Sequence, residues 1–154
     1  MALAGLLHQN AIIPAMRANS KKQLLQELAA KASKITGVPE REIFDVILQR
    51  ERLGSTGVGN GIAIPHGKLN NLPSIIGIFA RLDTPVDFEA LDDQPVDLVF
   101  LLLAPEGAGA DHLKALSRIA RVLRDQDMVA KIRSSDSASA IYTLLDDDAT
   151  SHAA

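Results

Sequence analysis

The sequence predicts a single α/β domain in which helices cover both faces of a β-sheet. Two runs of mainly apolar residues, at 75–82 and 98–103, have the character of buried strands. Segments with apolar residues at helical spacing precede and follow these runs. A length of 154 residues fits one domain and is sufficient to bury a core without disulfide bonds.

The first predicted helix starts after Ser20. Ser20 and Gln23 have the spacing of a capping box, and Gly37 is suited to end the helix. A second helix is expected from Pro39, a residue favoured in a first helical turn. Two glutamates near its start complement the positive end of the helix dipole, and Gly54 stops it.

The predicted strands follow this helical pair. Residues 62–64 are expected to form a short extended segment, which Pro65 pins in that conformation. The runs at 75–82 and 98–103 predict two longer strands, and residues 83–95 between them predict a turn-rich connection. The order of the strands within the sheet is not predicted.

A third helix is expected to open at Asp111. Two short helices follow, at about 127–133 and 136–145. The domain is therefore predicted to span residues 1–145, and residues 146–154 are expected to form a loose tail because they contain few apolar side chains. The inner face of the third helix is predicted to carry Leu113, Leu116, Ile119 and Leu123.

The composition excludes several classes of function. The absence of cysteine rules out disulfide bonds, a thiolate zinc site and a cysteine nucleophile. A net charge of −3, 3% aromatic residues and no tryptophan give neither the basic field nor the stacking platforms that nucleic acid binding requires. No signal peptide is recognised, and no apolar run is long enough to insert into a membrane. We therefore expect a cytoplasmic protein with no nucleic acid partner.

Residues 54–67 carry the most informative motif, Gly-Ser-Thr-Gly-Val-Gly-Asn-Gly-Ile-Ala-Ile-Pro-His-Gly. Glycines allow backbone N–H groups to converge, and converging N–H groups bind anions. The motif leads to His66, and a neutral imidazole can act as a covalent nucleophile. Arg50 and Arg52 close the preceding helix, and a guanidinium would favour the neutral ring and attract phosphoryl oxygens. The motif predicts that His66 accepts a phosphoryl group.

Other interpretations stay open from the residues alone. The motif lacks the Gly-Lys-Ser/Thr ending of a Walker A loop, and its third glycine comes one place early for a dinucleotide fingerprint. A tight turn at a sheet edge would also explain the glycines. Ser55 with His66 could suggest a serine hydrolase, although no nucleophile elbow frames Ser55. His66, His112 and an aspartate could hold a metal ion. His112 also lies at a predicted helix start, where anions are favoured.

Residues 51–67 resemble the phosphorylation-site signature of the fructose/mannitol-type enzyme IIA domains (EIIA type 2) of the bacterial phosphotransferase system. That signature asks for an acidic or amide residue, which is Glu51 here, then a hydrophobic and a small residue, then Ile-Ala-Ile-Pro-His-Gly. The resemblance continues at 94–98 and 112–120, covers about residues 5–145 and is strongest to the nitrogen-regulatory branch. It implies a mixed β-sheet sandwiched between helices.

The resemblance also implies roles for individual residues. His66 matches the phosphorylated histidine, and its tele nitrogen (Nε2) is the expected site, although the sequence itself does not distinguish the two ring nitrogens. Arg50 matches the active-site arginine, and His112 matches a second active-site histidine that orients or stabilises the phosphohistidine. No metal ion or cofactor is implied. The loop around the phosphoryl group is expected to contain Ser55, Thr56, Gly59, Asn60 and Gly61.

The implied partners are proteins. The family's donor is a small phosphocarrier of the HPr type, here its nitrogen branch, and the implied targets include potassium transport proteins and their sensor kinase. Two alternatives remain. A sugar-specific IIA would pass the phosphoryl group to a separate IIB protein, whereas a binding-only regulator would never carry phosphate.

Overall fold

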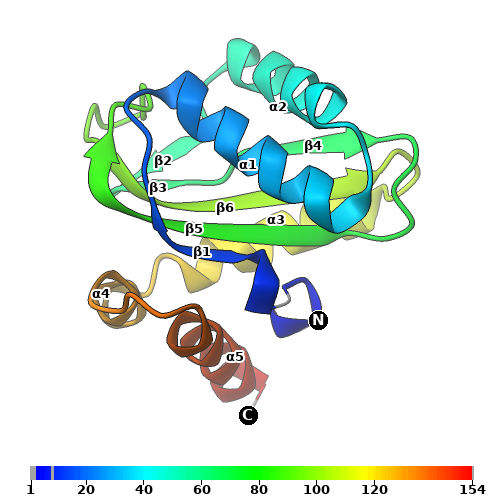
Figure 1. Cartoon of the computed structure of the whole chain (residues 1–154). Helices are drawn as coiled ribbons and strands as arrows, with labels where there is room; N and C mark the ends of the chain where they lie inside the picture. The colour runs from blue at the N-terminus through cyan, green and yellow to red at the C-terminus, as the bar shows by residue number, and fades with distance from the viewer. Residues whose placement is uncertain (1–2, 8, 154) are drawn as a thin grey trace.

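The structure, a computed structural model, describes residues 3–7 and 9–153 (Figure 1). Ala154, the last residue of the predicted tail, lies outside this range. The described elements are, in order, η1 (Leu3–Gly5), η2 (Gln9–Ala11), β1 (Ile12–Met16), α1 (Lys21–Thr36), α2 (Glu40–Leu53), β2 (Gly57–Gly59), β3 (Ile62–Ala63), β4 (His66–Leu69), β5 (Ile76–Val86), β6 (Val96–Pro105), α3 (Ala110–Val122), α4 (Gln126–Arg133) and α5 (Ala138–Ala153).

Within the described residues, six strands form one mixed sheet in the order β1-β5-β6-β3-β2, and β4 also pairs with β6. β5 and β6 are antiparallel, and their pairing places Phe79 opposite Phe100 with the rings edge to face. β1 runs parallel to β5, and both β3 and β4 run parallel to β6. The predicted α/β class with a mixed sheet is confirmed.

Helices form a layer on each face of the sheet. Figure 1 shows α1 and α2 on one face and α3, α4 and α5 on the other. α2 contacts β4 and α1 contacts β5, whereas α3 contacts β6 and α5 contacts β1. The core therefore lies in two slabs, one on each side of the central β5–β6 pair. No helix among the described residues is long and apolar enough to cross a membrane.

The two N-terminal helices follow the predicted signals. Ser20 caps α1 by accepting a hydrogen bond from the backbone N–H of Gln23 at 3.1 Å, and Gly37 ends it in the left-handed conformation at φ 79°. α2 begins directly after Pro39 and stops at Gly54. Its buried face includes Ile43 and Ile47.

The strand predictions are incomplete. β5 extends to Val86 through a register shift after Arg81, so part of the expected connection is strand. The sequence patterns do not predict β1, β2 or β4. β1 contains Pro14, which sheets tolerate at an edge, and β1 is an edge strand. β2 and β4 are short and lack an alternating pattern, and pairing with neighbouring strands holds them in place.

The predicted inner face of α3 is wrong at Leu113, whose side chain is 67% exposed. The buried positions are His112, Ala115, Ile119 and Val122. Ile119 and Leu123 are buried and Leu116 packs against the core as predicted, so the buried face is rotated toward Ala115 and Val122 by less than the 100° step of one residue. The rotation matters because it turns His112 toward the sheet.

The C-terminal segment also differs from the expectation. Residues 146–153 continue α5 in the structure, whereas their composition suggested a loose tail. No glycine or proline interrupts the chain after Ser137, so nothing in the local sequence stops the helix. The boundary of the domain at residue 145 stays a prediction.

Candidate functional site

His66 lies where a strand is interrupted. β3 and β4 pair with the same side of β6 in succession, with Ile62 opposite Leu98 and His66 opposite Leu102. Between them the chain passes through Pro65, which has no N–H to give to a ladder. The carbonyl of Pro65 still accepts from the N–H of Leu102 at 3.0 Å. The interruption presents His66 as the first residue of a new strand at the sheet edge.

Gly67 lets α2 approach this strand closely. A Cβ atom at Gly67 would lie 2.5 Å from Cγ1 of Val46, so any side chain would push α2 away. Arg50 lies one helical turn after Val46 on the same face of α2. The missing side chain at Gly67 therefore brings the Arg50 guanidinium to the histidine beside it.

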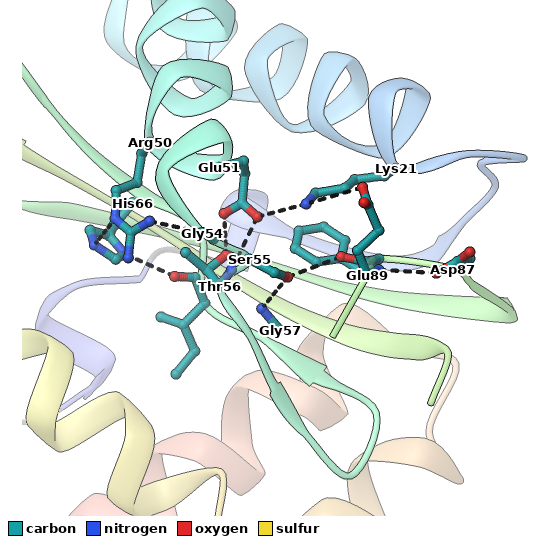
Figure 2. Close-up of polar contacts among 12 residues, drawn as sticks. Lys21, Arg50, Glu51, Gly54, Ser55, Thr56, Gly57, His66, Asp87 and Glu89 are labelled. Atoms are coloured by element: carbon teal, nitrogen blue, oxygen red, sulfur yellow. Dashed lines mark hydrogen bonds and ion pairs between the residues drawn. The ribbon is translucent and has the colours of Figure 1, made fainter. Parts of the chain in front are cut away.

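The hydrogen bonds of His66 define its tautomer (Figure 2). Nδ1 lies 2.9 Å from the carbonyl oxygen of Ile64, which can only accept, so Nδ1 carries the proton. Nε2 then has a free lone pair, and it accepts from Nε–H of Arg50 at 3.3 Å. Nη1 of the same guanidinium donates to the carbonyl oxygen of Gly54 at 2.9 Å. The nitrogen that carries the lone pair thus faces the arginine.

The surroundings of His66 favour its neutral form. Burial lowers the pKa of the ring below the ordinary 6.5; the hydrogen bond to Ile64 opposes this shift, Arg50 adds to it and Glu51 opposes it. A ring that is neutral at physiological pH keeps the Nε2 lone pair available as a nucleophile.

His112 comes from the opposite helical layer. Its ring centroid lies 5.5 Å from that of His66 with the planes tilted by 57°. The residue is 6% exposed, and its buried Nδ1 has no hydrogen-bond partner within the part of the chain that the structure describes. Burial lowers the pKa of His112, and His66 and Lys68 lower it further. A neutral His112 has one N–H to donate toward a ligand at His66.

A hollow of about 600 Å³ opens over these side chains. Leu53 lines it and is 86% exposed, and Leu113, next to His112 in α3, is also exposed. The site therefore combines basic and apolar side chains on an accessible face. The lining residues are Val46, Gln49, Arg50, Arg52, Leu53, His66, Gly67, Lys68 and His112.

The structure separates the glycine-rich half of the motif from this hollow. Asn60 and Gly61, both at positive φ, form the turn between antiparallel β2 and β3. The N–H of Asn60 donates to Asp92, and its carbonyl accepts from Arg133. These groups are occupied within a hairpin at the sheet edge. None of the five predicted loop residues, Ser55, Thr56, Gly59, Asn60 and Gly61, lines the hollow at His66.

Ser55 and Thr56 hold the turn that leads out of α2. The Ser55 hydroxyl donates to the carbonyl of Phe88 at 3.0 Å and accepts from the N–H of Gly57 at 3.1 Å. Ser55 thus has no hydrogen bond to His66 that would activate it as a hydrolase nucleophile. Thr56 is bound through its N–H and its hydroxyl to Glu51. Among the described residues, no group of three or more His, Asp or Glu side chains could hold a metal ion.

Two side chains beside the site, Glu51 and Lys21, have no role predicted from the sequence. Glu51 is buried and pairs with Lys21 at 3.1 Å (Figure 2). The signature was the available signal, because it asks for an acidic or amide residue at position 51. Near the exposed end of a helix such a requirement indicates that other groups of the protein bind the side chain. Lys21 gave no signal, since the first residue of a helix is ordinarily solvated.

Comparisons with known proteins agree with this fold. Residues 5–148 match the family described as "Phosphoenolpyruvate-dependent sugar phosphotransferase system, EIIA 2". A protein of Bradyrhizobium diazoefficiens called "Nitrogen regulatory protein" is 66% identical over 94% of this chain and 95% of its own length. The crystal structure of "Nitrogen Regulatory Protein IIA-Ntr" from Neisseria meningitidis superposes with a TM-score of 0.88, 34% identity, and coverage of 93% and 98%.

A more distant structure shares the fold alone. It is a complex of enzyme IIAMtl with phosphorylated enzyme IIBMtl from Escherichia coli, with a TM-score of 0.77, 22% identity, and coverage of 90% and 96%. Together these matches place the protein in a class: it belongs to the EIIA type 2 family of the phosphotransferase system, whose members carry phosphoryl groups. Within that family it is similar to the nitrogen regulatory proteins.

Proposed function

We propose that this protein accepts a phosphoryl group on Nε2 of His66 from an HPr-like phosphocarrier of the nitrogen branch and regulates target proteins through its phosphorylation state. The observation that carries this proposal is the pair of hydrogen bonds at the ring. Ile64 holds the proton on Nδ1, and the lone pair of Nε2 points to Arg50. The similarity to nitrogen regulatory proteins supports the regulatory part.

The transfer balances without a proton moving between the two proteins. The lone pair of His66 Nε2 attacks phosphorus in line, and the bond from phosphorus to the donor's nitrogen breaks with its electron pair returning to the donor ring. His66 becomes an imidazolium that carries the phosphoryl group on Nε2 and the proton on Nδ1. The Ile64 carbonyl stabilises the positive ring, and the donor ring loses the equivalent charge.

Arg50 and His112 act on the phosphoryl oxygens. Such transfers pass through a loose transition state, so positioning and charge stabilisation provide most of the catalysis. Arg50 must release the Nε2 lone pair as the donor arrives, and its guanidinium then binds the equatorial oxygens in a fork. The carbonyl of Gly54 keeps the guanidinium in place during this exchange. His112 donates its N–H to an oxygen on the other side.

The predicted loop residues take a supporting role in this proposal. Ser55 and Thr56 fix the turn after α2, and Gly59, Asn60 and Gly61 form the hairpin that anchors the segment before His66. None of them is assigned a contact with the phosphoryl group.

Docking uses the accessible hollow. Leu53 and Leu113 offer apolar contacts, and Arg52 and Lys68 attract an acidic, phosphorylated donor. Phosphorylation places about two negative charges on the phosphoryl oxygens and one positive charge on the ring, a net change of about −1 on a face with apolar rims. We infer that targets, among them potassium transport and sensor proteins, bind the free and phosphorylated forms with different affinities.

One alternative has an observation in its favour. The fold is shared with an IIA protein solved in complex with phosphorylated IIB, so this chain could pass its phosphoryl group to a separate IIB. Phosphoryl transfer to purified IIB proteins would identify that function, and no such transfer would leave the regulatory proposal in place.

The test of the phosphoryl acceptor uses a phosphorylated HPr-type donor and mass spectrometry under non-acidic conditions. We expect an acid-labile phosphate on His66 that is absent in His66→Ala, and ¹⁵N NMR should place it on Nε2. His112→Gln should be phosphorylated at the same residue but more slowly. Phosphate on another residue, or none from either sugar-type or nitrogen-type donors, would contradict the proposal.

A further inference from the structure

Glu51 is a buried carboxylate for which phosphoryl transfer as proposed above has no direct use. Its side chain is 2% exposed. One carboxylate oxygen accepts from the backbone N–H of Thr56 at 3.1 Å, and the other accepts from the Thr56 hydroxyl. A buried carboxylate destabilises a fold unless it is paired and hydrogen-bonded. Both oxygens are engaged here, so the carboxylate holds the Thr56 backbone firmly.

Lys21 compensates the charge of Glu51 from a different element. Its Nζ lies 3.1 Å from Oε1 of Glu51, 3.9 Å from Oε1 of Glu89 and 4.6 Å from the centroid of the Phe88 ring. Lys21 is the first residue of α1, so the pair joins the start of α1 to the end of α2. The exposed Glu89 is a secondary partner, because its side chain is 78% exposed.

The turn between Glu51 and Thr56 contains the group that holds Arg50. The carbonyl of Gly54 accepts from Nη1 of Arg50, and the N–H of Gly54 donates to the carbonyl of Glu51 at 3.1 Å. The direction of that carbonyl depends on where Thr56 is fixed. Figure 2 shows Arg50 directed toward His66 and Glu51 directed toward Lys21, away from each other, with this turn between them.

We propose that Glu51, paired with Lys21, is a positioning residue for phosphoryl transfer: it fixes the turn whose Gly54 carbonyl holds the Arg50 guanidinium against Nε2 of His66. This inference rests on the proposed function of His66. Glu51 acts through Arg50 and has no contact with the phosphoryl group.

The first measurement needs no phosphoryl donor. In the free protein, the Nε–H resonance of Arg50 reports its hydrogen bond to His66 in ¹H–¹⁵N NMR spectra. We expect Glu51→Gln to shift this resonance toward that of an unbound arginine and to speed its exchange with water. Glu89→Gln is the matched control, because it removes only the exposed partner of Lys21, and it should leave the resonance unchanged.

The second measurement is a double-mutant cycle on the rate of His66 phosphorylation. We expect Glu51→Gln to slow the reaction by about 10- to 100-fold, the range that a small misplacement of a catalytic group produces. In an Arg50→Met background the same change should have almost no further effect, because the residue it positions is gone. Equal effects in both backgrounds would show a merely structural role and overturn the proposal.

A second variant separates loss of positioning from loss of folding. Glu51→Gln leaves Lys21 with only the exposed Glu89 as a partner, whereas Lys21→Met combined with Glu51→Gln removes both charges of the buried pair. This double variant should fold, as thermal unfolding would verify, and should still show the displaced Arg50 resonance and the slow reaction. Lys21→Arg keeps the positive charge beside Glu51, so it should phosphorylate at the wild-type rate. Wild-type behaviour of the double variant in both measurements would refute the positioning role.

The two proposals can fail separately. If no donor phosphorylates the wild-type protein at His66, the proposed function fails, whatever the NMR result. If the wild type is phosphorylated and Glu51→Gln matches it in rate and in the Arg50 resonance, only the positioning role fails.

Discussion

The glycine-rich motif consists of two regions that differ in what their backbones do. In residues 57–61 the glycines build a hairpin, and the polar groups of its turn are bound by Asp92 and Arg133. In residues 62–67 a broken strand presents His66 to solvent, and Gly67 allows α2 to pack closely against the strand. The first region contains most of the glycines of the motif, and the second contains the side chain that lines the hollow.

This difference shows that glycine content by itself did not locate the site. A glycine-rich segment is required equally by a tight hairpin and by an anion cradle. What distinguishes the second region is a proline that interrupts the ladder, a carbonyl that fixes a tautomer, and an arginine that approaches from α2. Substitutions in the two regions should therefore have different consequences.

The largest expected effect comes from Gly67→Ala. The added methyl group would meet Val46 at 2.5 Å and push α2 from β4. We expect a loss of about 1–3 kcal/mol in stability from overpacking. Because Arg50 moves with α2, phosphorylation of His66 should slow by about 100-fold. Chemical denaturation and donor assays on the same sample measure both effects.

A second substitution, at Val46, tests whether the clash causes the slow reaction. Val46→Ala creates room for the new methyl group, so the double variant should recover most of the rate. Gly107→Ala is the control, since nothing lies within 4 Å of a Cβ atom there. A Gly67→Ala protein that phosphorylates normally would mean that the close approach of α2 is not needed.

A smaller and different effect is expected from Gly61→Ala in the hairpin. Its φ of 80° disfavours alanine by about 1–2 kcal/mol, and its methyl group would clash with Nη2 of Arg133. Stability should fall, but the folded protein should be phosphorylated at the wild-type rate. Gly37→Ala has a similar φ of 79° with open space around it, so it separates backbone strain from the clash. A slow reaction in folded Gly61→Ala would place the hairpin in the site after all.

The sequence predicted the elements whose signals are local. Ser20, Gly37 and Gly54 marked the ends of two helices, and the apolar runs marked β5 and β6. β4 was missed because His66, Gly67 and Lys68 have no strand pattern, and their conformation depends on pairing with β6. Pairing between distant segments leaves no mark on the local sequence.

The sequence predicts which residues form the candidate site but not how they are arranged. The motif pointed to His66 and the helix end to Arg50, and the resemblance added the role of His112; the structure brings the three together from β4, α2 and α3. The rotation of α3 that turns His112 inward and exposes Leu113 was missed, because an apolar leucine and a histidine at adjacent positions favour the opposite assignment. The link from Glu51 to Lys21 spans two helices and cannot be read from either one.

The smallest expected effect concerns protonation, and it separates the two halves of the motif without disrupting either. Burial lowers the pKa of His66 below 6.5, and Arg50 lowers it further. In Arg50→Met the pKa of His66 should rise toward 6.5, as NMR titration of the ring would show, whereas Gly61→Ala should leave this pKa unchanged.

The unfolded chain binds protons on His66 and His112 more readily than the folded one, so stability should fall as the pH drops below about 6.5. Arg50→Met should weaken that fall, because raising the folded pKa of His66 brings the proton affinities of the two states together. If stability has the same dependence on pH in the wild type and in Arg50→Met, then the arginine does not act on the charge of His66, and its contribution to the site would be limited to binding the phosphoryl oxygens.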